Sequence, residues 1–252
     1  EKIIKQYGAE ILRLWVAGEN YREDIRLSNQ ILQRLSEAYR RIRNTCRFLL
    51  GNLHDYEGFK YDSSNFPISE RNEIDRLILS RLDKLIEKVK KAYEDYEFHT
   101  VYHALNNFCA VDLSAFYMDV LKDRLYISLP DDPERISALV TMDDVLDTLL
   151  RLMAPILSFT SEEVYRYTDK RYGESIHFSV FPETDSERRD PQLESKWKRL
   201  LEIRPEVLKA IEETRKIQEK GKGSSLNFSV LIYAPEDIRE ELLPLVDKME
   251  DI

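Results

Sequence analysis

The stretch from Ser28 to Leu53 limits the possible folds more than any other part of the chain. Its apolar residues recur at steps of three and four positions, the spacing of one face of an α-helix. They are Ile31, Leu35, Ala38, Ile42, Cys46, Leu49 and Leu53. A single long helix with one apolar face has to pack against other elements, and the stretch therefore predicts a helical bundle.

The opposite face of this helix is predicted to face solvent and to bind an anion. At about 100° per residue it carries Glu37, Arg40, Arg41, Asn44, Arg47 and Phe48. Six arginines and one acid lie between Ile25 and His54, although the whole chain has a formal charge of −9. A ring beside guanidinium and amide groups can stack on an unpaired base, which indicates nucleic-acid binding. The alternative is a merely solvated face, with Phe48 covered by a neighbouring segment.

The composition fits a globular, mainly helical protein. The chain has 42% hydrophobic and 34% charged residues, and only 7 glycines and 9 prolines. We expect a cytoplasmic protein with no membrane partner, because there is neither a signal-peptide pattern nor an apolar run of about 20 residues. Cys46 and Cys109 lie on apolar faces without CxxC spacing, which predicts buried, reduced thiols.

Further helices are predicted from the same periodicity. Ser69 is the expected N-cap of the helix over 69–96, and Pro155 is expected to end or kink the helix over 134–157. Thr160 with Glu163 forms a capping-box pattern before the short helix over 161–168. The pattern of the later helix that begins at Leu193 is interrupted near Arg204 and Pro205. The predicted helices are 1–21, 69–96, 98–126, 134–157, 161–168, 193–219 and 235–249, and the predicted extended segments are 175–182 and 226–233.

Some residues have a spacing or a composition that could indicate a catalytic or metal site, but they are better explained as structural. His99 and His103 have the spacing of two metal ligands, but no third ligand follows at a useful spacing. Asp119 and Asp123 are expected to join an ion-pair network, with Arg124 as an available partner. The glycine turn 221–225 lacks the spacing of a phosphate-binding loop.

Several segments resemble the class I aminoacyl-tRNA synthetases of the isoleucyl, valyl and leucyl group. QYGAEILRLWVAGENYREDIRLS (6–28) resembles the segment that follows their KMSKS loop, and YRRIRNTCRFLLGNL (39–53) the first helix of their anticodon-binding bundle. MAPILSFTSEEVYRY (153–167) is similar to another bundle segment, and residues 204–233 are similar to the C-terminal junction region of isoleucyl enzymes. DLSAFYMDVLKDRLY (112–126) resembles the isoleucyl member most closely.

The resemblance implies a mainly α fold: an antiparallel helical bundle followed by a small α+β junction domain. Residues 1–27 would be a connecting segment that follows the catalytic domain, residues 28–184 the anticodon-binding bundle, and residues 185–252 part of the junction domain, with a helix, a strand and a helix. Motifs like HIGH and KMSKS are absent, so the chain is expected to be an inactive fragment with no catalytic residue, cofactor or metal of its own. The parent would use ATP and magnesium, in its catalytic domain, to attach isoleucine to tRNA.

The partners that the resemblance implies are tRNA-Ile, through its anticodon stem-loop, and the parent's own catalytic domain. Arg41, Asn44, Arg47 and Phe48 match the helix that meets the anticodon loop, and geometry adds Arg40. Tyr39 and Arg43 flank this face and are weaker candidates. The alternatives are a valyl or leucyl enzyme, or a helical scaffold that binds an acidic protein surface.

Overall fold

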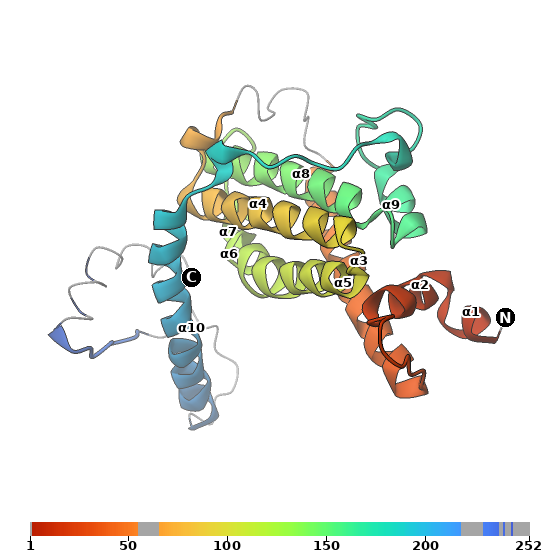
Figure 1. The fold of residues 1–252 in the computed structure, drawn as a ribbon. Helices are drawn as coiled ribbons and strands as arrows, with labels where there is room; N and C mark the ends of the chain where they lie inside the picture. The colour runs from red at the N-terminus through yellow and green to blue at the C-terminus, as the bar shows by residue number, and fades with distance from the viewer. Residues whose placement is uncertain (1, 55–65, 218–228, 237–238, 240–242, 244–252) are drawn as a thin grey trace. The chain divides into compact units, whose positions relative to one another are not determined.

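The computed structural model describes residues 2–54, 66–217, 229–236, 239 and 243, and these residues contain helices and no strand (Figure 1). The chain divides into two compact units, Glu1–Asp190 and Pro191–Ile252. None of the described helices is both long and apolar enough to cross a bilayer. The mainly helical class predicted from the sequence is therefore confirmed, whereas the α+β character of the C-terminal part is not shown.

The long amphipathic helix is present as predicted. It is α3, Asn29–Leu53, and the Ser28 hydroxyl caps it by accepting the Ile31 N–H at 3.2 Å. The buried face follows the predicted periodicity, with two kinds of exception: Leu32 and Thr45 are buried although they were not predicted, and Ile31 and Leu53 are only half-buried. The buried residues are Leu32, Leu35, Ala38, Ile42, Thr45, Cys46 and Leu49.

Helix α8, Pro133–Met153, is the core helix of the first unit, since 14 of its 21 residues are buried. It packs against α3 and against α4, Glu73–Glu94 (Figure 1). The Asn72 N–H donates to the Ser137 hydroxyl at 2.9 Å, and the Tyr93 hydroxyl donates to the Leu152 carbonyl at 2.9 Å. These bonds join like ends of α4 and α8, and the two helices therefore run parallel. The chain turns at residues 154–157, where Pro155 was expected to end the helix.

The predicted helix over 98–126 is not one regular α-helix. It consists of α5, Phe98–Asn107, then η2, Phe108–Tyr117, a π-helical segment, then α6, Met118–Val120, and α7, Lys122–Tyr126. A π-helical turn holds more residues than an α-helical turn, and this shifts the buried face. Leu121 is consequently buried, whereas Val120, at the i+4 position from Phe116, is half-buried.

The predicted N-cap at Ser69 is wrong. The Asn72 side chain caps α4 by accepting the Ile74 N–H at 3.1 Å, and Ile68–Glu70 form a separate 3₁₀ turn. The reason lies in the intervening Arg71, whose fully buried side chain donates to Asp144 at 2.7 Å. Arg71 is extended, with ψ 151°, and this interrupts the helix between Ser69 and Asn72.

The capping box at Thr160 is also wrong, because a residue remote in sequence supplies the cap. Helix α9, Ser158–Tyr165, begins before Thr160, whose hydroxyl lies 3.0 Å from that of Tyr39. The Glu10 carboxylate accepts the N–H groups of Phe159 at 2.7 Å and of Thr160 at 3.1 Å. A side chain of the N-terminal segment thus satisfies the first turn of α9.

The N-terminal segment is divided by Gly8, which has φ +88°, into α1, Lys2–Tyr7, and α2, Ala9–Gly18. The buried face of α2 includes Leu14, whereas the apolar Val16 is 58% exposed. Arg13 of α2 donates to the Ile156 carbonyl at 2.7 Å. Helix α2 therefore binds the turn that leads into α9 as well as the first turn of α9.

An ion-pair network was expected around Arg124, and it exists with a different carboxylate. Arg124 donates to Asp75 at 2.5 Å, and Asp75 also accepts the hydroxyls of Tyr117, at 2.7 Å, and Ser137. Asp119 pairs instead with Lys122, at 2.6 Å. The network joins α4, η2, α7 and α8 through one fully buried carboxylate.

Both cysteines are free and buried, as predicted, and burial raises the pKa of Cys46 to about 12. The expected extended segment 175–182 is only partly extended: Ser175 and Ser179 have extended backbone angles, but the three residues between them do not. Ile176–Phe178 form a 3₁₀ turn, held by the Ser175 hydroxyl, which donates to Glu162 at 2.8 Å.

In the second unit, α10 spans Pro191–Ile217 and continues through Pro205, so that the expected interruption is absent. An interior proline removes one backbone donor and its ring crowds the carbonyl four residues earlier, so α10 continues through Pro205 in spite of a local cost. Residues 229–233, the described part of the predicted strand, are not in a strand. A strand requires a neighbour to pair with its backbone, and the described residues provide none. Most of the predicted helix 235–249 lies outside the described residues, as does the glycine turn.

Candidate nucleic-acid interface

The outer face of α3 presents the predicted cations to solvent. Arg40, Arg41, Asn44 and Arg47 are all exposed. In the part of the chain that the structure describes, no carboxylate forms an ion pair with any of the three arginines. The charge of Arg41 partly opposes the burial that raises the pKa of Tyr102 on α5, which places Arg41 on the side of α3 near that helix. These unpaired cations are available to an anionic ligand.

Phe48 was predicted to face solvent, and it is half-buried. One turn before it, the Thr45 hydroxyl lies 3.2 Å from that of Ser114 in η2. Residues three apart share a helix face, so Phe48 is on the flank of α3 that η2 covers. Only part of the ring remains available to a ligand.

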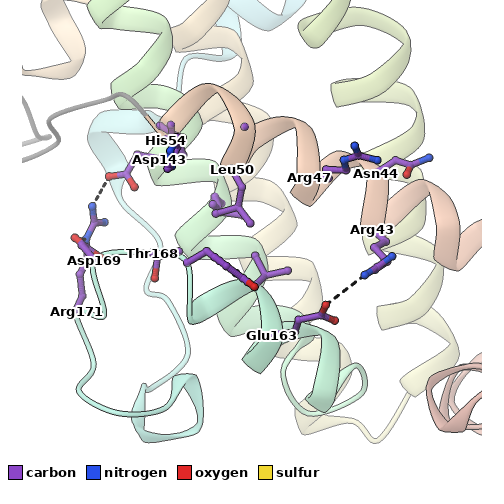
Figure 2. A pocket seen from close by; sticks show the side chains of 15 residues that line it. Arg43, Asn44, Arg47, Leu50, His54, Asp143, Glu163, Thr168, Asp169 and Arg171 are labelled. Atoms are coloured by element: carbon purple, nitrogen blue, oxygen red, sulfur yellow. Dashed lines mark hydrogen bonds and ion pairs between the residues drawn. The ribbon is translucent and has the colours of Figure 1, made fainter.

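The other flank of α3 opens into a cavity of about 720 Å³ (Figure 2). Asn44 and Arg47 line it together with Arg43, which the sequence had ranked lower. Arg40, Arg41 and Phe48 are not part of its lining. The five predicted site residues therefore do not form one patch, because two lie at the cavity and three lie outside it.

Two contacts join α3 to α9 beside this cavity. Arg43 pairs with Glu163 at 3.3 Å, and both side chains are more than half exposed (Figure 2). Tyr39 makes the hydroxyl contact with Thr160 described above. Tyr39, a weaker candidate for binding, thus has a structural contact.

Apart from Glu163, named in the capping-box pattern, the wall opposite α3 consists of residues that the sequence analysis did not single out. Tyr167, which follows α9, lines the cavity and is 77% exposed. Arg171 bonds to Asp143 and, at 2.6 Å, to Asp169 (Figure 2). Burial raises the pKa of Asp143 although Arg171 opposes this. Residues 164–172, VYRYTDKRY, alternate aromatic and charged side chains, which is the signal that could have identified this wall.

The site contains cations, an amide and aromatic rings, which are groups that can bind a ligand. Within the described ranges, no group of three or more His, Cys, Asp and Glu residues is placed to hold a metal ion. The two histidines with ligand spacing, His99 and His103, lie on α5.

Comparisons with known proteins match this arrangement. Residues 75–230 match the family model described as the anticodon-binding domain of tRNA ligase. Among curated relatives, the isoleucine–tRNA ligase of Syntrophotalea carbinolica is 51% identical over 243 residues, covering 96% of this chain and 26% of the relative. That of Natranaerobius thermophilus is 46% identical over 252 residues, covering 100% of this chain and 27% of the relative.

A solved structure shares the fold. It is the LeuRS of Agrobacterium radiobacter K84, in a ternary complex with tRNA and LeuAMS, with a TM-score of 0.57 and 17% identity over 75% of this chain and 21% of that one. The chain thus spans about a quarter of the length of the curated relatives that it matches.

Proposed function

The chain belongs to the family of anticodon-binding domains of tRNA ligases, and from this premise we propose that it is the tRNA-binding portion of an isoleucine–tRNA ligase. The observation that carries the proposal is the exposed face of α3, where Arg40, Arg41 and Arg47 have no ion pair to a described carboxylate in a chain of formal charge −9. The isoleucine–tRNA ligases among its relatives, 44 to 51% identical, favour the isoleucyl over the valyl or leucyl alternative.

We assign different parts of the RNA to the residues of this face. Guanidinium groups contact phosphates irrespective of sequence, which positions the RNA. The Asn44 amide can donate to and accept from a base edge, and Phe48 offers a partly exposed ring for stacking. The bases of an anticodon loop are unpaired, so their faces and edges are free for such contacts. The proposed ligand is therefore the anticodon stem-loop of tRNA-Ile.

The remaining chemistry of the ligase is proposed to lie outside this chain. ATP and magnesium would bind in the parent's catalytic domain, which we propose as the second partner, with α1 and α2 in the connecting segment that follows it. We further propose a cytoplasmic parent and an α+β junction domain that begins near residue 185. The 252-residue chain alone is expected not to activate isoleucine, because the sequence has no motif for binding ATP.

Salt dependence of tRNA binding tests the proposal. If Arg40 and Arg47 contact phosphates, each Arg→Ala variant weakens all tRNAs similarly and flattens the plot of log affinity against log salt by about 0.7 to 1 unit. Filter binding of a tRNA-Ile transcript at several salt concentrations measures this slope. Arg22→Ala, which removes an exposed arginine of the N-terminal segment, is the matched control and should leave the slope as it is.

Two results would contradict the proposal. One is an unchanged slope in both variants, which would mean that the arginines are merely solvated. The other is the absence of tRNA binding together with binding of an acidic protein that needs the same arginines, which would favour the scaffold alternative.

A further inference from the structure

We propose that the cavity between α3 and α9 binds one unpaired base of the RNA, stacked on Tyr167 and separate from the phosphate contacts of the α3 face. This inference rests on the proposed function and adds a base-binding position to it. The cavity, of about 720 Å³, lies in the size range of pockets that enclose small ligands, roughly 300 to 1,000 Å³, and a base with its sugar fits within it.

The charges of the lining favour an uncharged group over a phosphate. Its formal charges cancel, because it includes three arginines, at positions 43, 47 and 171, and three carboxylates, at positions 143, 163 and 169. Arg171 is bonded to two of these carboxylates, and Arg43 to the third. The lining as a whole therefore has no net positive charge, and its one arginine without a described carboxylate partner, Arg47, is also on the exposed outer face of α3. Arg40, outside the cavity, is likewise exposed and has no carboxylate partner among the described residues. We therefore infer that the phosphates follow the outer face of α3 while a neutral base enters the cavity.

The walls have the groups that recognise a base. Tyr167 has an exposed ring, and among the described residues no other aromatic ring or cation packs on it. Leu146, Leu50 and Val164 provide apolar surface for the body of the base. Asn44 lies at the cavity and can bond a base edge as donor and acceptor (Figure 2). An aromatic platform beside apolar and polar groups is the usual arrangement for a splayed-out base.

One residue of the cavity wall allows the space to be filled deliberately. Gly51 lines the cavity from α3, and a Cβ added there meets no atom within 4 Å. Gly51→Trp adds an indole at the wall of the space that the proposal gives to the base, and its Cβ itself meets no neighbouring atom. Gly51→Ala adds only a methyl group and serves as the control for size.

The experiment measures binding of a tRNA-Ile transcript, and of transcripts with an abasic site at each anticodon-loop position, to the 252-residue chain and its variants. Stacking on an aromatic ring predicts that Tyr167→Ala weakens binding by about 5- to 100-fold. Tyr167→Phe, which keeps the ring, should restore most of that affinity. Tyr126→Ala, which removes another exposed tyrosine, on α7, should bind like the wild type. Gly51→Trp should bind far more weakly than Gly51→Ala.

Two further readouts separate this inference from the proposed function. One abasic position should weaken binding to the wild type and have no further effect on Tyr167→Ala, because both changes remove the same stacking contact. The salt slope should be unchanged in Tyr167→Ala, because the ring carries no charge. Thermal melts of each variant confirm folding, and an exposed ring is not needed for stability.

Each outcome of the experiment bears on the cavity inference. If tRNA binding depends on the α3 arginines while Tyr167→Ala and Gly51→Trp bind like the wild type, the cavity inference is overturned and the proposed function stands. If Tyr167→Ala weakens binding and no abasic position couples to it, the ring does not stack on a base and the inference also fails. If the wild type binds no tRNA, both fail together.

Discussion

Replacing Asp75 by alanine should destabilise the first unit more than any surface change. Its carboxylate is fully buried and is the shared acceptor for Arg124, Tyr117 and Ser137. Removing one partner of a buried ion pair costs about 3 to 5 kcal/mol, and each hydroxyl left without its acceptor costs about 1 to 3 kcal/mol more. Arg124 keeps a bond to the Glu134 carbonyl, at 2.7 Å, so the ion-pair loss is expected near the lower limit. With about 3 kcal/mol for the ion pair and about 1 to 3 kcal/mol for each of the two hydroxyls, we expect a total loss of about 5 to 9 kcal/mol in the free energy of unfolding.

Urea unfolding followed by circular dichroism measures this loss, with the midpoint and the slope compared between variants. Asp119→Ala is the matched control, because its partner Lys122 and Asp119 itself are about half exposed, and such surface pairs contribute at most about 1 kcal/mol. Asp75→Asn keeps the size of the side chain and removes the charge, so it should show most of the loss. An Asp75→Ala variant within about 1 kcal/mol of Asp119→Ala would refute the reasoning that this network stabilises the unit.

Two further predictions concern Glu10 and Phe48. Burial is the largest cause of the raised pKa of Glu10, so the folded state holds the proton of this carboxyl more tightly than the unfolded state does. The stability that this group contributes therefore falls as the pH rises from about 4.3, the unfolded value, through the folded pKa. Melting temperatures of Glu10→Gln should therefore improve relative to the wild type between about pH 4 and pH 7, and a constant difference would contradict this. Phe48→Ala should lose roughly 1.5 to 2.5 kcal/mol of stability, about half the cost at a fully buried site, as well as tRNA affinity. A melt paired with a tRNA titration checks it, and lost stability with unaltered affinity would mean that the ring only packs.

Helix positions and buried faces were the most predictable part of the fold. The periodicity of α3, α4 and α8 depends on the segment's own residues and on the need to bury one face, so the sequence contains it directly. The wrong predictions include helix ends, the regular helix expected where η2 lies, and parts of the two extended segments. Ser69 and Thr160 have the right residue type for a cap, and a cap also requires that no remote group competes. Arg71 bonded to α8 and Glu10 bonded to α9 are such groups.

The candidate site, like the fold, was predictable only in part. The exposed cations of α3 follow from helical spacing, and Arg40, Arg41, Asn44 and Arg47 are exposed as predicted. The half-burial of Phe48 could not be predicted from helical spacing, because it depends on what packs against that flank of α3. There η2 contacts α3 through Ser114 and Thr45, and η2 departs from the α-helical period. Tyr167 reaches the cavity only through the packing of α9 against α3.

The sequence by itself determined that this chain is helical, which face of α3 is apolar, and which face is positively charged, because these properties arise among residues within a few turns of one another. The tertiary structure decided how the helices end, which carboxylate Arg124 bonds, and that Arg43, Arg47 and Tyr167 share one cavity. Each of these depends on segments far apart in the chain, some separated by more than 100 residues, as in the pair of Arg43 and Glu163. The periodicity of one segment cannot indicate such contacts, because only packing of the core brings the distant segments together.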